Sequence, residues 1–281
     1  MKKLCILLLP LLYLAFTKTG YSQVSINPTA VFLDPNSKVG NFFIANSSEN
    51  PVEIQLNFEF AYPDTDEEGN PYLNYEDQET KEQYSLEPYL RAFPSTFVLQ
   101  PNQRQTVRLL ARFPADKPDG TYWTRMRVSS SQLSPPIGEA PEGEVTAQVG
   151  FQIDQVTAVL VHHGTVQTKL TVHGSRVHVV NDRLVVLTEV ERTDGNAPFI
   201  GSVRTRIFNP NGELITENSR PTSVYFKNLR RVEINMNEED DEWPSGQYTA
   251  ETTFVPSRND VLPQHIPQID PVSTTTTFTI D

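Results

Sequence analysis

The sequence predicts an all-β protein built from two sandwich domains, and three observations support this prediction. Apolar and polar residues alternate in short runs, which is the period of a strand with one buried face. The 22 prolines and 13 glycines make long helices unfavourable and separate the runs by turns. At roughly 150 residues per domain, a chain of 281 residues suggests two domains.

The N-terminus predicts a cleaved secretory signal over residues 1–22. Lys2 and Lys3 form a positive start, residues 4–16 are apolar, and Gly20 and Ser22 place small residues at the cleavage site. The apolar run is shorter than the roughly 20 residues that a spanning helix needs. We therefore expect an exported protein whose mature chain begins at Gln23 and does not insert stably into a membrane.

Charge and cysteine content narrow the function. The chain has a net charge of −12, and removal of residues 1–22 takes away three lysines, leaving 20 Lys and Arg against 35 Asp and Glu. Nucleic acids and anionic membranes attract clustered Lys and Arg, so neither is an expected partner. The single cysteine, Cys5, lies inside the signal, so the mature chain has neither disulfides nor cysteine metal ligands.

The first half reads as a series of strands. The clearest runs from Val52 to Tyr62, where every second residue is apolar, between Pro51 and Pro63. Other strands are expected over residues 24–33, 39–45, 95–99, 105–113 and 121–128. Residues 63–88 form an acidic insertion, within which residues 76–87 are expected to form a short helix.

A Pro/Gly-rich loop over residues 132–144 precedes a long strand expected over residues 145–162. The alternation of this strand changes phase. Val149, Phe151 and Ile153 alternate with polar residues, whereas residues 156–161 are nearly all apolar. A strand of this kind either serves two surfaces or contains a bulge.

His162, His163 and Gly164 are interpreted as the domain boundary, which gives domains over residues 23–163 and 164–281. Strands resume beyond it. They are expected over residues 169–172, 176–180, 183–192, 200–208, 230–236, 247–255 and 273–280. Short alternating strands separated by turns are typical of a second sandwich.

An ordered set of segments in the first half carries a family resemblance. The segments are residues 24–34, 39–46, 50–52, 92–103, 105–109, and 120–128 with Trp123. In this order they resemble the N-terminal domain of the PapD-like periplasmic pilus (fimbrial) chaperones, over residues 24–161. The resemblance implies an immunoglobulin-like sandwich, and the second half is similar to a generic immunoglobulin-like or fibronectin-like module.

The resemblance also implies a function in the periplasm without catalysis. Such chaperones lend a strand to an exported subunit whose sandwich is incomplete, and an outer-membrane usher then receives the subunit. On this interpretation Val149, Phe151 and Ile153 are the lent side chains. The alternative for these residues is that they belong to the domain's own core. For the protein, the alternative is a structural or cell-surface module that recognises a protein or glycan.

One feature departs from the family. Its members bind the subunit's C-terminal carboxylate with an arginine on the first strand and a lysine on the last. The corresponding positions here are Ala30 and residues 157–159, which include no basic residue, whereas Arg108, Arg125 and Arg127 lie elsewhere. We therefore expect the carboxylate anchor to be absent or built differently.

Metal and catalytic sites have weak support. Asp64, Asp66 and Glu68 resemble the start of a calcium loop, but the twelfth position is Tyr75, which favours a solvated insertion. The acidic run 237–242 is interpreted as a solvated loop. The sequence contains no G-x-S-x-G motif, no Gly-rich phosphate loop and no cysteine nucleophile, so we expect neither an enzyme nor a cofactor.

Overall fold

The computed structural model describes residues 24–114, 116–133, 151–236 and 243–280. The predicted signal, Val149, most of the Pro/Gly-rich loop and the acidic run 237–242 lie outside this part of the chain. Of the residues that the structure describes, 64% are in strands and 6% in helices, which confirms the all-β class. No described helix is long and apolar enough to cross a membrane.

Two sheets packed face to face form the first sandwich. One contains, in spatial order, β1 (Val24–Asn27), β3 (Val39–Asn46), β9 (Arg104–Ala111) and β7 (Leu90–Phe93). The other contains β2 (Ala30–Leu33), β11 (Gln152–His163), β10 (Gly120–Gln132), β4 (Val52–Glu59) and β8 (Thr96–Leu99). The strand predicted over residues 24–33 thus divides into β1 and β2, which belong to different sheets.

The alternation read from the sequence decides which side chains fill this core. In β4, Val52, Ile54 and Leu56 are buried, whereas the residues between them are exposed. Phe42 of β3 and Val107 of β9 close the core from the opposite sheet. β4 therefore buries one face, as the period of two predicts.

The acidic insertion forms a hairpin followed by short helices. The hairpin consists of β5 (Tyr62–Thr65) and β6 (Pro71–Asn74), and it was not predicted. The predicted helix is present in a shorter form, α2 (Gln78–Tyr84), followed by a single 3₁₀ turn (Glu87–Tyr89). Asp77 caps α2, because its side chain accepts a hydrogen bond from the Thr80 amide at 3.0 Å.

The second sandwich also has two sheets. The first consists of β12 (Thr168–Val180), β13 (Arg183–Gly195) and β16 (Lys227–Asn235). The second consists of β15 (Leu214–Val224), β14 (Phe199–Phe208), β17 (Gly246–Val255) and β18 (Val272–Ile280). The two strands expected over residues 169–180 are one irregular strand, β12. β15 was not predicted, because the residues between Ile215 and Val224 are polar apart from Pro221 and show no apolar alternation.

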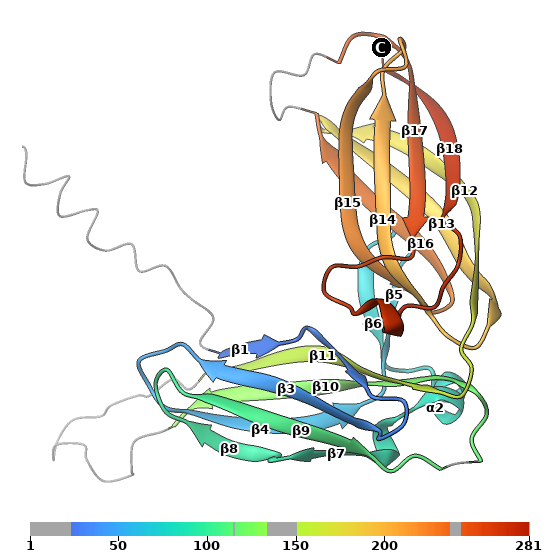
Figure 1. Cartoon of the computed structure of the whole chain (residues 1–281). Coiled ribbons are helices and arrows are strands. Elements are labelled where there is room, and N and C mark those ends of the chain that lie inside the picture. Colours follow the sequence, from blue (N-terminus) through green and yellow to red (C-terminus); the bar gives the residue numbers. More distant parts are fainter. Residues whose placement is uncertain (1–23, 115, 134–150, 237–242, 281) are drawn as a thin grey trace, which may run out of the picture.

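The two sandwiches meet at a steep angle, with the β5–β6 hairpin and α2 close to the junction (Figure 1). β11 ends at His163 in the first sandwich, and β12 begins at Thr168 in the second. A cluster of large apolar side chains crosses the junction: Phe60, Tyr62, Trp123 and Leu160 from the first sandwich, and Ile200, Tyr225, Val261 and Ile266 from the second. The Trp123 and Tyr225 rings lie 4.8 Å apart, so the junction is a packed interface.

Candidate functional site

One edge of the first sandwich is only half covered. β11 pairs with β10 from Gln152 to His163 without a register shift. On its other side, β2 pairs with β11 in parallel, but only over Ala158–Val161. Among the described residues, no strand forms a ladder with this outer edge over residues 152–157, although the Gln155 side chain donates to the Val24 carbonyl at 2.9 Å and the Thr157 hydroxyl donates to the Thr29 carbonyl. We call this N-terminal half of β11 the open edge, because no strand continues the sheet beside it.

Apolar side chains stand along the open half of β11. Phe151, just before the strand, is 75% exposed, and Ile153 and Val156 are 40% and 37% exposed. Farther along the same strand, Val159 and Leu160 are almost completely buried. The strand therefore serves two surfaces and contains no bulge.

The buried half of β11 explains its continuous apolar run. Val159 and Val161 pack into the core of the first sandwich, whereas Leu160 packs into the junction cluster. Both faces of the strand are covered here, so both accept apolar residues. Of the three predicted donor residues, Phe151 and Ile153 are exposed, and Val149 lies outside the described part of the chain.

A cavity of about 210 Å³ lies beside the open edge, between the two sandwiches. Its walls include Ala30, Arg125, Val156, Ala158, Tyr225 and Arg258. Three of these residues form a row across the sheet, because Ala30 of β2 is opposite Ala158 of β11, which is opposite Arg125 of β10. Of the two family positions that lack a basic residue here, the one on β11 therefore lies next to an arginine on the adjacent strand, and Ala30 lies one strand farther from it.

Arg125 carries the uncompensated charge of this cavity. Its side chain is almost fully buried, with the residue 8% exposed, and its Nε donates to the Ala61 carbonyl at 3.1 Å. Arg125 makes no ion pair with any described residue. By contrast, Arg258 donates to both carboxylate oxygens of Asp260, at 2.9 and 2.5 Å, which lowers the pKa of Asp260. A buried cation without an acid is costly, and an anion in the cavity would offset that cost.

Tyr225 forms the wall next to this arginine. Burial raises the pKa of its hydroxyl, and the charge and hydrogen bond of Arg125 partly oppose that rise. The hydroxyl is therefore neutral at physiological pH. It contributes a polar group but no charge to the cavity, so Arg125 alone sets the preference for anions.

Sequence reasoning did not identify Arg125 as part of a site. The sequence does contain one indication of its role. Arg125 is the single charged residue within residues 120–126 of β10, and every residue of that range is buried. Its place beside Ala158 depends on the register between β10 and β11, which one sequence does not reveal. Arg127, two residues away, is partly exposed and pairs with Glu59 and Asp154.

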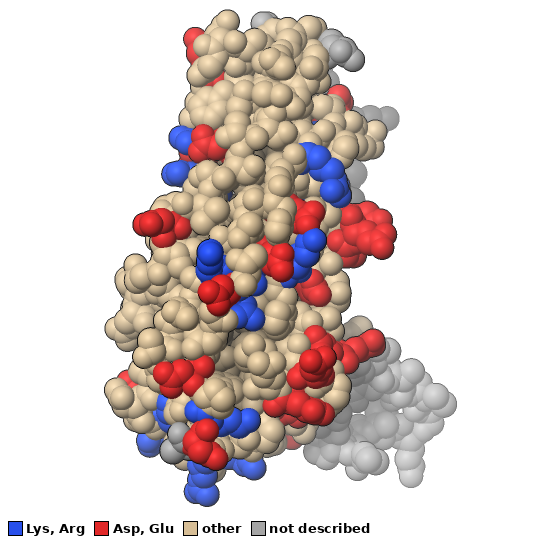
Figure 2. Space-filling view, turned by 90° about the vertical axis from the view of Figure 1, so that its right-hand side faces the viewer, with Lys and Arg blue, Asp and Glu red and all other residues tan. Residues whose placement is uncertain are grey.

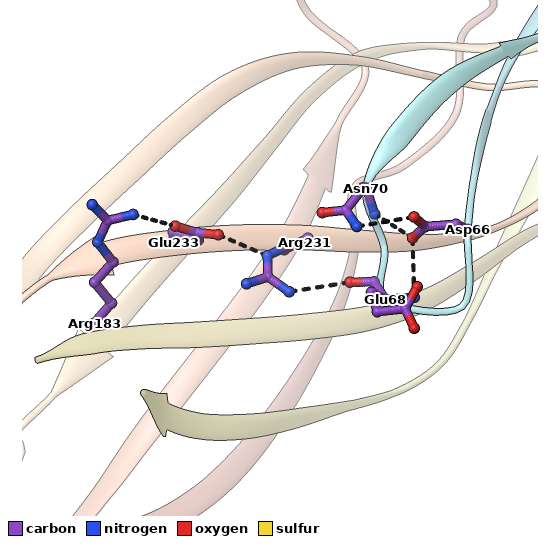
Figure 3. Close-up of polar contacts among 6 residues, drawn as sticks. All are labelled: Asp66, Glu68, Asn70, Arg183, Arg231 and Glu233. Carbon is purple, nitrogen blue, oxygen red and sulfur yellow. Dashed lines mark hydrogen bonds and ion pairs between the residues drawn. The ribbon is translucent and has the colours of Figure 1, made fainter. Parts of the chain in front are cut away.

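The calcium candidates have other partners (Figure 3). Asp66 accepts hydrogen bonds from the amides of Glu68 and Asn70, at 3.0 and 2.7 Å, and so closes its own turn. Asp64 accepts one from the Asn228 side chain at 2.9 Å. Among the described residues, no three His, Cys, Asp or Glu side chains are grouped as metal ligands would be. In this structure the loop that contains these residues contacts the second sandwich and binds its side chains.

No family model matches the chain, and no curated protein matches its sequence. Solved structures do match it. The YadV chaperone is 11% identical, with 92% of this chain and 100% of that one covered and a TM-score of 0.45. The Salmonella enterica SafA pilin in complex with the SafB chaperone gives 14% identity, 93% and 98% coverage and a TM-score of 0.40.

The Acinetobacter baumannii CsuC–CsuE chaperone–tip adhesin subunit complex gives 9% identity, 90% and 98% coverage and a TM-score of 0.41. All three of these solved structures contain a chaperone, and in two of them the chaperone is in complex with a pilin or tip subunit.

Proposed function

We propose that this protein is a periplasmic chaperone-like protein that binds an exported subunit by strand addition along the open half of β11. The observation that carries the proposal is that no described strand joins the β11 side of the sheet ladder over residues 152–157, together with the exposed side chains of Phe151 and Ile153. An open edge with apolar side chains is a template for another strand, which soluble proteins ordinarily protect.

Strand addition uses both features of this edge. The backbone groups of residues 152–157 would hydrogen-bond to the incoming strand, and alternate apolar side chains would enter its groove. Phe151 and Ile153 lie two residues apart and thus share one face. The proposed partners are exported subunits of a fimbria or another surface structure, with an outer-membrane usher as the acceptor of the complex.

We further propose that Arg125 binds the C-terminal carboxylate of the subunit in the cavity between the sandwiches. The cavity adjoins the open edge, since Val156 lines it. A carboxylate there would neutralise an almost fully buried guanidinium through charge-assisted hydrogen bonds. The anchor would then lie one strand farther into the sheet than the family's positions at Ala30 and residues 157–159.

The test is capture of partners from the native periplasm by the mature protein, with co-purifying chains identified and then rebound as purified proteins. The Phe151→Asp variant should lose the dominant subunit, because a carboxylate does not enter an apolar groove. Val98→Asp is the matched control, since Val98 is a 41% exposed residue on β8, at the opposite edge of the same sheet.

Undiminished capture by Phe151→Asp would show that β11 is not the donor strand. Capture of a glycan-bearing surface component that both variants retain would instead support the alternative of a cell-surface binding module. Both variants should unfold at the temperature of the unmodified protein, because neither side chain belongs to the core.

A further inference from the structure

The outer face of the β1-β3-β9-β7 sheet has a charge opposite to that of the protein. Arg91 of β7 and Arg104 and Arg108 of β9 point outwards and are exposed. The other outward positions of the four strands carry no Asp or Glu: Ser25, Asn27, Val39, Asn41, Phe43, Ala45, Phe93, Thr106 and Leu110. On a chain with a net charge of −12, this is a basic face without compensation.

The three arginines have no acidic partner among the described residues, a property that they share with the exposed Arg112, Arg176 and Arg220 but not with five other arginines. Arg127, Arg183, Arg206, Arg231 and Arg258 all form ion pairs. Arg91, Arg104 and Arg108 form none with any described residue. Their charge is therefore available to a partner. The space-filling view shows basic side chains at the lower end of the molecule, with acidic side chains beside them (Figure 2).

Aromatic side chains lie between these charges. The Arg104 guanidinium stacks 3.7 Å from the centre of the Phe43 ring, which restricts its orientation. Phe93 is 58% exposed and lies opposite Arg108 in the β7–β9 pair. Exposed aromatic residues and arginines are the residue types enriched at protein–protein interfaces and among their energetic hot spots.

We propose that this face docks a protein surface rich in Asp and Glu. An extended anionic surface, such as a membrane or a nucleic acid, is repelled by the strong negative charge of the rest of the chain. A compact acidic protein experiences mainly the local charge, because screening limits the field to about 8 Å at physiological salt. The face belongs to the sheet opposite β11, so it remains open when the open edge of β11 is occupied.

The experiment compares two charge reversals of equal size. Arg104→Glu/Arg108→Glu alters the basic face, and Arg183→Glu/Arg220→Glu alters exposed arginines of the second sandwich. The probe is labelled poly-L-glutamate, and its binding to the full mature chain is followed by fluorescence anisotropy at several salt concentrations. The face variant should bind at least about tenfold more weakly than the control variant, and the difference should shrink with salt.

Three results would overturn the proposal. Equal weakening of binding by the two reversals would exclude a specific face, because net charge alone would then account for the binding. Arginine-dependent binding to phosphatidylglycerol vesicles, without binding to poly-L-glutamate, would assign the face to lipid. Self-association that only the Arg104→Glu/Arg108→Glu variant abolishes would assign it to a second copy of the chain. Melting curves recorded for all variants serve as the control that each variant is folded.

Discussion

Arg125 is the residue on which the proposed partner contact most depends. The sheet places it in a row with two alanines, Ala158 and Ala30, whose small side chains leave room for a ligand beside the guanidinium. Retention of a buried cation without an acid is unfavourable for the free protein. A ligand carboxylate supplies the missing negative charge only in the complex. The free energy that the free protein loses by burying the cation is therefore recovered on binding and increases the affinity.

Arg125→Met should therefore separate stability from binding. Methionine retains most of the apolar contact, so the free energy of unfolding should stay the same or rise. Affinity for the captured subunit should fall about tenfold to hundredfold, since a hydrogen bond to a charged group contributes about 1.5–3 kcal/mol. Titration calorimetry measures this loss, with Arg220→Met, an exposed arginine on β15, as the control.

A subunit with an amidated C-terminus completes the test of Arg125. It should bind the unmodified protein as weakly as the native subunit binds Arg125→Met, and it should lose little more with that variant. If amidation leaves the affinity unchanged, the carboxylate does not enter the cavity, whatever the variant does.

Among the secondary-structure elements, the β5–β6 hairpin links the two sandwiches. It leaves the first sandwich after Phe60 and rests on β16 of the second. Asp64 accepts from the Asn228 side chain at 2.9 Å, and Thr65 Oγ1 accepts from the Leu229 amide at 2.8 Å. At the turn, Gly69 has φ +80°, and a Cβ there would lie 2.9 Å from the Leu229 carbonyl oxygen. The hairpin thus approaches β16 so closely that its turn requires glycine.

Asn228→Ala should weaken this link. Asn228 is 4% exposed, and its loss would leave Asp64 without the amide donor, at a cost of about 1–2 kcal/mol in the free energy of unfolding. Urea unfolding measures the change. Asn211→Ala, at an exposed turn, is the control and should change stability by less than about 0.5 kcal/mol. Equal midpoints for the two variants would mean that the hairpin contributes nothing to holding the sandwiches together.

For the whole molecule, the sequence revealed what depends on local periodicity and missed what depends on register or distant contacts. Alternation over Val52–Tyr62 was enough to predict a strand with one buried face. β15 was missed because an exposed edge strand of polar residues has no apolar alternation. The β5–β6 docking joins residues 164 positions apart, and the row from Ala30 to Arg125 needs the pairing of three strands. The open edge of β11 was indicated by its change of phase, but its length followed only from where β2 begins.

The junction between the sandwiches also contains two buried histidines. The carbonyl of His265 accepts from His162 Nε2 at 3.0 Å, so neutral His162 carries its proton on Nε2 and accepts from Thr121 Oγ1 on Nδ1, at 2.8 Å. The His265 ring stacks on Phe32, with ring centres 4.8 Å apart. Burial lowers the pKa of both imidazoles, and the charge of Lys38 lowers that of His162 further.

These lowered pKa values predict that acid weakens the junction. The unfolded chain takes up protons near pH 6.5, before the folded protein does, so the free energy of unfolding should be greatest above that pH and should fall as the pH drops below it. Urea unfolding between pH 7.5 and 5.5 measures the slope, above the range in which most carboxylates titrate. His162→Gln should flatten the slope, because glutamine can donate to the His265 carbonyl without titrating, whereas His178→Gln, at an exposed position of β12, should leave it unchanged. Equal slopes in the two variants would show that the junction histidines do not couple pH to the contact between the sandwiches.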